Sequence, residues 1–251
     1  RFSMTQTSVL RAAPPKARIH MMDELRGFAV HCMVFYHAFY SAAYLLGWQW
    51  GKVLLSFFTP AEPYFAGLFI LISGISSQLS HSNLIRGLKL LAVAVCVTLV
   101  TGFFLPDQII RFGILHMLSI CMITFGLVQK AFEHVPALLG ILVFAVLFAL
   151  LYGFDGAFGF TTTFDTQFLF PSSIPDGRMY SADYFPIIPW LLLFYCGTFL
   201  GHYAREGLFP KFLYPSRIPA LSFLGRHALL IYIVHQPVIY GAMLAVQYFI
   251  G

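Results

Sequence analysis

Charged residues are scarce in this sequence. Only 10% of its 251 residues are Asp, Glu, Lys or Arg, whereas an ordinary soluble domain contains about 25%. Hydrophobic residues make up 59% of the chain, and they gather in runs of about 20 residues separated by short polar breaks. So little charge cannot cover a water-soluble protein of this length. We therefore predict an all-α, polytopic integral membrane helical bundle.

Cysteine is also sparse, and the sequence has no CxxC spacing and no close cysteine pair. The four cysteines each lie within an apolar run, so we expect no disulfide framework and no metal site, and we interpret them as small buried apolar side chains. They are Cys32, Cys96, Cys121 and Cys196. Basic tracts with interleaved aromatics are absent as well. The net charge of +5 is therefore interpreted as loop orientation and not as a nucleic-acid partner.

The apolar runs predict about seven transmembrane helices in one domain. Residues 1–18 form an N-terminal cytoplasmic tail, and residues 19–251 form the transmembrane domain. The connection 47–63 is predicted to be a first outer loop, and it contains no histidine. The predicted spans are 25–46, 64–80, 84–104, 109–129, 136–153, 184–204 and 223–248.

Lysine and arginine set the predicted orientation. With the N-terminus in the cytoplasm, twelve of the 15 basic residues lie at the cytoplasmic side and three lie outside. This is a strong positive-inside bias, and an odd number of spans then places the C-terminus outside. The long connection 154–183 lies outside too, and its aromatic content favours a functional loop over a disordered linker.

An arginine and a histidine share one face of the first span, in the stretch DELRGFAVHCMVFYH. Eleven residues at 100° each leave Arg26 and His37 only about 20° apart around the helix and roughly 16 Å apart along it. A coenzyme A thioester fits this spacing, with its phosphates on Arg26 and its acyl group near His37. A neutral His37 could take a proton from an acceptor, or carry the acyl group itself.

Each of these two residues also has a simpler interpretation. Arg26 would only reach lipid phosphate, as arginines at helix ends commonly do. His37 would only hydrogen-bond a backbone carbonyl or a neighbouring helix.

Two further spans bring histidines to a similar depth. FGILHMLSIC places His116 in the fourth span, with Arg111 at the outer end, and LGRHALLIYIVHQP places His235 in the last. Pro237 removes a donor from the helix ladder there, and with Gln236 beside it a polar cavity is predicted. Asp183, at the outer entrance of the sixth span, is either an acceptor ligand or a helix cap.

Five stretches in order resemble one known family. They are LRGFAVHCMVFYH, LFILISGISSQLS, FGILHMLSICMI, DYFPIIPWLLLFYCGTFLG and SFLGRHALLIYIVHQPVI. Together they look like the catalytic domain of the heparan-α-glucosaminide N-acetyltransferase family in its bacterial form, which is related to the acyltransferase-3 enzymes. The resemblance implies that residues 19–251 form an acyltransferase domain. It also implies that Arg26 lies on the coenzyme A side and that His37 is the catalytic candidate.

The leading prediction is therefore a transferase of the bacterial cytoplasmic (inner) membrane. It moves an acetyl or other acyl group from cytoplasmic acyl-CoA, chiefly acetyl-CoA, to an amino or hydroxyl group of an extracytoplasmic sugar or glycan. Its expected partners are membrane lipid, these two substrates and possible second copies of the chain, with no nucleic acid and no metal. The predicted site residues are His37, His116 and His235 for catalysis; Arg26, Arg226 and Arg86 for the donor; and Arg111, Asp183 and Gln236 for the acceptor.

Two other functions stay open from the sequence. A small transporter or channel would use the three histidines as a polar pathway, although no inverted repeat is visible and the spacing of Arg26 and His37 would then serve no purpose. A membrane scaffold without chemistry would need neither residue for an activity.

Overall fold

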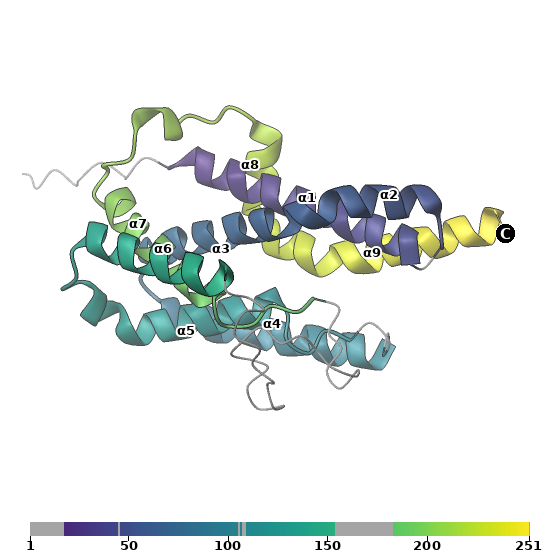
Figure 1. Ribbon diagram of the computed structural model, residues 1–251, viewed down its shortest axis with the longest axis horizontal. Coiled ribbons are helices and arrows are strands. Elements are labelled where there is room, and N and C mark those ends of the chain that lie inside the picture. The colour runs from purple at the N-terminus through teal and green to yellow at the C-terminus, as the bar shows by residue number, and fades with distance from the viewer. Residues whose placement is uncertain (1–17, 45, 105, 107–108, 154–182, 251) are drawn as a thin grey trace, which may run out of the picture.

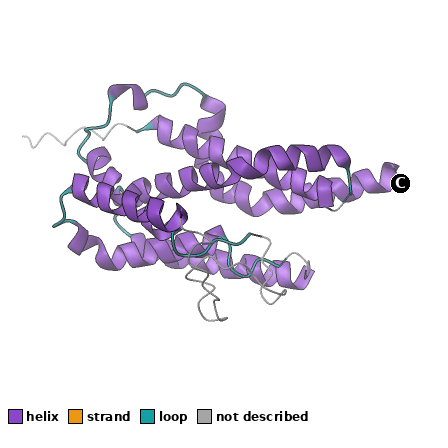
Figure 2. Cartoon of the chain, viewed as in Figure 1, coloured by secondary structure: helices purple, strands orange, loops and turns teal. Residues whose placement is uncertain are grey.

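We describe a computed structural model of the chain, in which residues 18–44, 46–104, 106, 109–153 and 183–250 are placed. Every regular element in these residues is helical (Figure 2), so the predicted fold class is confirmed. The helices are α1 (His20–Tyr44), α2 (Gln49–Phe58), α3 (Glu62–Gln78), α4 (Asn83–Phe104), α5 (Ile114–Phe132), α6 (Ala137–Gly153), α7 (Trp190–Arg205), α8 (Pro219–Arg226) and α9 (Ala228–Ile250), with short 3-10 turns η1 (Thr59–Ala61) and η4 (Lys211–Leu213).

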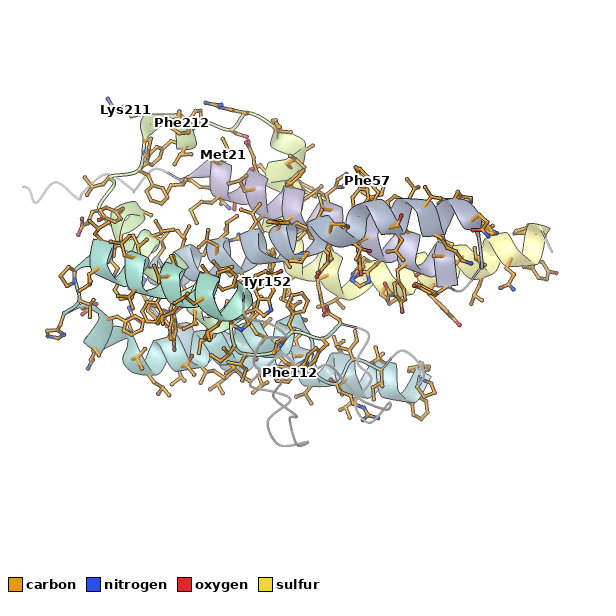
Figure 3. All side chains as sticks on the ribbon, viewed as in Figure 1. Met21, Phe57, Phe112, Tyr152, Lys211 and Phe212 are labelled. Atoms are coloured by element: carbon orange, nitrogen blue, oxygen red, sulfur yellow. The ribbon has the colours of Figure 1, made fainter. Side chains whose placement is uncertain are left out.

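Four helical stretches are long and apolar enough to cross a membrane, and α6 is a shorter apolar helix. The four stretches are Gln49–Gln78, Asn83–Phe104, Ile114–Phe132 and Ala228–Phe249. Large apolar side chains on α2, α4, α6 and α9 are exposed on the outside of the bundle, among them Phe57 (Figure 3). Because a soluble protein would cover such faces, they are the lipid-contacting surface of an integral membrane protein.

The predicted outer loop 47–63 is wrong, because helix α2 occupies most of it. Gly51 and Leu55 lie one turn apart on the buried face of α2, and Gly51 packs against Ala42 and Ala43 at the end of α1. This stretch contains two prolines, Pro60 and Pro63. Both stand at the first or second position of the helical element that follows, where proline is tolerated, so the chain stays helical into α3.

The predicted last span, 223–248, is divided in two. Helix α8 ends at Arg226, and α9 begins at Ala228, with His227 outside helical geometry between them. The last apolar helix, α9, therefore starts later than the predicted residue 223. The separate helix α8 lies across α1 (Figure 1). Gly27 of α1 and Gly225 of α8 allow this crossing, since a side chain on either would overlap backbone atoms of the other helix.

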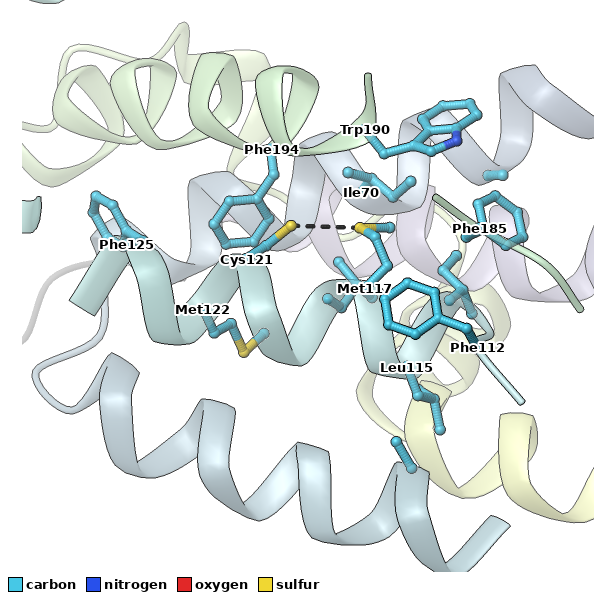
Figure 4. Close-up of a cluster of buried hydrophobic side chains, with 14 of the residues drawn as sticks. Ile70, Phe112, Leu115, Met117, Cys121, Met122, Phe125, Phe185, Trp190 and Phe194 are labelled. Carbon is cyan, nitrogen blue, oxygen red and sulfur yellow. Dashed lines mark hydrogen bonds between the residues drawn. The ribbon is translucent and has the colours of Figure 1, made fainter. Parts of the chain in front are cut away.

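A similar close approach joins α3 to α7. Gly74 of α3 allows this contact, because a methyl group there would overlap the carbonyl oxygen of Phe194. Next to this seam lies the core of α5 and α7, where the Phe125 and Phe194 rings are 6.5 Å apart and the Cys121 thiol donates to the Met117 sulfur at 3.4 Å (Figure 4).

The four cysteines are free thiols with different surroundings. Cys121 and Cys196 are buried, as predicted, and Cys32 is partly buried. Cys96 departs from the prediction. It lies on an exposed face of α4, where lipid and not protein surrounds it.

Glu24 fastens the start of α1 to the segment that precedes α8. Its carboxylate accepts hydrogen bonds from the Ser216 hydroxyl at 3.0 Å and from the backbone N–H groups of Arg217 at 2.7 Å and Ile218 at 2.9 Å. Burial alone raises the pKa of Glu24, but these three donors stabilise its ionised form, and the net pKa is lower than the usual 4.5. The hydrogen bonds of Glu24 at this end of α1 are therefore sensitive to acid.

We expect the hydrogen bonds accepted by the Glu24 carboxylate to weaken in acid. A carboxyl group whose pKa is lower in the folded state stabilises the fold above its unfolded pKa of about 4.5, and this contribution is lost as the pH falls through the folded value. In detergent, the Tm of the wild type should therefore fall more steeply below about pH 4.5 than the Tm of Glu24→Gln. Parallel curves for the two proteins would contradict this role of Glu24.

Candidate active site

A cavity of about 250 Å³ lies where α1, α3, the start of α5, the segment 183–185 and α9 meet. Its walls are mainly apolar, with a few polar groups among them. The polar side chains in its wall are Tyr36 and His37 from α1, Glu62 from α3, Asp183 and Tyr184 from the segment before α7, and Tyr232 from α9. An apolar hollow with few converging polar groups is the usual form of a small-molecule site.

One stripe of α1 connects this cavity with the arginine of the first span. Val30, Met33 and His37 all line the cavity, and Arg26 precedes Val30 by four residues. Because residues three and four apart share a helix face, the four side chains form one line along α1. The face predicted from the spacing of Arg26 and His37 is therefore the face that borders the cavity, although Arg26 itself does not line it.

His37 is accompanied by His235, whose ring centroid is 5.0 Å away. The buried His235 has its Nδ1 only 2.6 Å from the backbone carbonyl of Tyr232, so Nδ1 carries the hydrogen. Its Nε2 is then the acceptor, and this atom is buried without a hydrogen-bond partner among the described residues. The structure thus brings together two of the three predicted histidines.

Asp183 lies in the cavity wall, where it joins three elements. It accepts hydrogen bonds from the Tyr232 hydroxyl of α9 and from the backbone N–H of Ile114, at 3.2 Å, at the first residue of α5. Asp183 therefore caps a helix, although the capped helix is α5 and not α7. Its role as an acceptor ligand stays a prediction.

His116 lies outside this cavity, with both ring nitrogens engaged. The backbone N–H of Gly113 donates to its Nδ1 at 3.3 Å, so Nε2 carries the hydrogen and donates to the Thr98 hydroxyl at 3.2 Å. The Thr98 hydroxyl in turn donates to the carbonyl of Ile110 at 2.6 Å. Through its hydrogen bonds to Gly113 and Thr98, the His116 ring connects the start of α5 to α4.

Arg26 is held by two neighbours. Its Nη2 donates to the Ser76 hydroxyl of α3 at 2.6 Å, and its Nη1 lies 3.6 Å from a carboxylate oxygen of Asp23. The same carboxylate accepts a hydrogen bond from Arg18 at 2.7 Å. The guanidinium has five donors, so it can take a phosphate oxygen while keeping part of this network.

The other predicted site residues are more widely spread. Arg226 is exposed at the end of α8, next to the Gly225 that touches α1, and Arg86 is exposed on α4. Arg111 lies exposed just before α5. Gln236 of α9 has a buried side-chain oxygen with no hydrogen-bond partner in the described part of the chain. None of the four is in the cavity wall.

Four polar residues of the cavity wall, Tyr36, Glu62, Tyr184 and Tyr232, were not among the predicted site residues. Tyr36 was overshadowed by His37, and Tyr232 looked like one of many aromatic residues in an apolar run. Glu62 was overlooked because the connection 47–63 was expected to be a loop. The available signal was a single acidic residue between two prolines in an otherwise apolar stretch, TPAEPYF.

Of three comparisons with known proteins, one gives a match. In the described residues, no group of three or more His, Cys, Asp or Glu side chains could hold a metal ion. The searches of curated proteins and of solved structures found no match. A family model, heparan-alpha-glucosaminide N-acetyltransferase, catalytic, matches residues 18–237, a range that contains every residue of the cavity wall. The chain therefore belongs to the heparan-alpha-glucosaminide N-acetyltransferase catalytic family, and it is a membrane acetyltransferase of that family.

Proposed function

We propose that this acetyltransferase takes its acetyl group from cytoplasmic acetyl-CoA and transfers it to an amino or hydroxyl group of an extracytoplasmic sugar or glycan. In bacteria it would work in the cytoplasmic membrane. The observation that supports this most directly is the α1 stripe, which begins at Arg26 and leads along the cavity wall to His37. A donor with an anionic end and a distant acyl end fits such a stripe.

The size of the cavity limits what it can hold. About 250 Å³ is below the 300–1,000 Å³ of pockets that enclose a drug-sized ligand. It can take the thioester end of the donor together with the reacting group of an acceptor, but not the nucleotide of coenzyme A. The nucleotide would lie outside it, near Arg26, with Arg226 and Arg86 as further phosphate contacts.

His37 would perform the proton transfer of the reaction. In one route its unprotonated nitrogen takes a proton from the acceptor as the acceptor attacks the acyl carbon, and the proton then passes to the departing thiolate of coenzyme A. In the other, His37 attacks first and carries the acetyl group to the acceptor. His235 suits both routes, because its Nε2 can accept a hydrogen from the His37 ring after a small rotation and so fix its tautomer.

The donor half is tested by thermal stability in detergent with excess acetyl-CoA. At 100 times its dissociation constant, a ligand stabilises the folded state by about 2.7 kcal/mol. We expect the Tm of the wild type to rise accordingly, and that of Arg26→Ala to rise much less because a phosphate contact is lost.

A matched control is Lys130→Ala, which removes an exposed basic side chain at the end of α5, away from the α1 stripe. It should keep the full shift. If Arg26→Ala and Lys130→Ala respond alike, Arg26 is not part of the donor site. If the wild type shows no shift with acetyl-CoA or longer acyl-CoAs, the proposed donor is wrong.

The transporter alternative makes a different prediction in sealed vesicles. It expects histidine-dependent solute uptake without release of coenzyme A. The family membership favours the enzyme, because the family is defined by acetyl transfer.

A further inference from the structure

The cavity contains a second carboxylate besides Asp183. Glu62 stands in the first turn of α3 and lines the same hollow. Both carboxylates thus lie in the wall of one cavity of about 250 Å³. Like charges in an apolar cavity repel each other strongly, so such a pair needs a reason.

The two carboxylates differ in their partners. Asp183 is engaged by the Tyr232 hydroxyl and by the N–H of Ile114. Among the described residues, by contrast, no basic side chain pairs with Glu62, and no hydrogen bond to its carboxylate is formed. The polar groups that share the cavity with it are Tyr36 and His37 of α1, Asp183 and Tyr184 before α7, and Tyr232 of α9. Both bonds to Asp183 go to its Oδ2. Glu62 is thus the carboxylate in the described cavity wall that has both oxygens left for a ligand.

The chemistry of an amino acceptor gives such a carboxylate a task. In water near neutral pH an aliphatic amine is mostly an ammonium ion, which has no lone pair with which to attack a thioester. It must lose one proton before the attack and a second one during it. A single histidine that is also to protonate the thiolate cannot accept both.

We propose that Glu62 is a catalytic residue that binds the ammonium group of the acceptor and takes its first proton. This inference rests on the proposed function and deepens it by dividing the two protons between two residues. The acceptor R–NH₃⁺ gives one proton to the Glu62 carboxylate. The free amine then attacks the acetyl carbon, a C–N bond forms and the C–S bond breaks. His37 takes the second proton from nitrogen and delivers it to the thiolate, which leaves as coenzyme A thiol. Glu62 finally releases its proton to water.

The test measures coenzyme A release from acetyl-CoA with glucosamine as acceptor. The enzyme is kept in detergent so that both faces share one pH, and the pH is varied from one unit below to one unit above the pKa of the amino group of glucosamine. Below that pKa, Glu62→Gln should be about 100-fold slower than the wild type, a typical effect of losing a general base. Above it, most of the acceptor is already the free amine, so the gap should close several-fold.

Two further variants control for structural damage. Glu206→Gln, at an exposed position after α7, should match the wild type at every pH. Glu62→Asp keeps a carboxylate and should recover part of the activity below the pKa of the acceptor. A loss in Glu62→Gln that is the same at every pH would overturn the proposal, since a merely structural role gives that result. A wild type that releases no coenzyme A would overturn the proposed function itself, and this role with it.

Discussion

Replacing His37 with alanine is expected to lower acetyl transfer by at least about 100-fold, because it removes the group that we propose to exchange protons with the acceptor and with the thiolate. His37 lines the cavity and makes no hydrogen bond that holds helices together in the described structure. The fold should therefore survive. The rate of coenzyme A release and the Tm of the purified variant measure the two properties separately.

His31→Ala provides the control on the same helix. His31 is exposed and packs only against the ring of Phe35, at 4.7 Å between centroids. It does not line the cavity, so its loss should leave the rate within about two-fold, in line with the small effects of surface substitutions. Comparable losses in His31→Ala and His37→Ala would show that α1 needs its histidines for folding, and His37 would lose its assigned role.

A methyl group at Gly74 is expected to destabilise the protein more than any single methyl added to an open helix face. In Gly74→Ala the new carbon would overlap the carbonyl oxygen of Phe194, and backbone cannot rotate away as a side chain can. Overpacking of this kind costs about 1–3 kcal/mol. For a chain of this size the Tm should fall by about 2–4 °C for each kcal/mol.

Gly241→Ala is the matched control, since it makes the same change inside another helix. At Gly241 a methyl group would meet no atom within 4 Å. The better helix propensity of alanine should then stabilise α9 by up to about 1 kcal/mol. Opposite shifts in Tm are thus expected from the same substitution at two sites. If both variants shift the Tm in the same direction, α3 and α7 are not held at the distance described.

The apolar runs predicted most of the helices, because the length of an apolar stretch in a membrane protein is set by the bilayer. The prediction was wrong at 47–63, a stretch that contains Pro60 and Pro63. Pro60 and Pro63 can break a helix or begin one, and only the packing of Gly51 against α1 decides between the two. The break at His227 has a similar origin, since α8 packs across α1 and nothing in its own composition marks its end.

Helical spacing was sufficient to predict which site residues share a face of one helix. It was insufficient to predict which residues of different helices meet. It put Arg26 and His37 on one face of α1, and the cavity borders that face. It could not tell that His235 meets His37 while His116 is turned toward Thr98, because this depends on how α5 and α9 are placed. To predict Glu62 as a site residue, the sequence would have had to reveal both helix α3 from residue 62 onward and the side chains that share the cavity with Glu62.

The two glycine contacts restrict how this protein can move. Transporters alternate their access by rocking one helix group against another, and such motion needs an interface that can slide or open. Here α1 touches α8 backbone to backbone at Gly27 and Gly225, α3 touches α7 in the same way at Gly74, and the Arg26–Ser76 bond joins the two pairs. Helices held together by such contacts are poorly suited to a rocking motion. Under the proposed function, only an acetyl group would have to pass the middle of the bundle, while the coenzyme and the sugar would each stay on their own side.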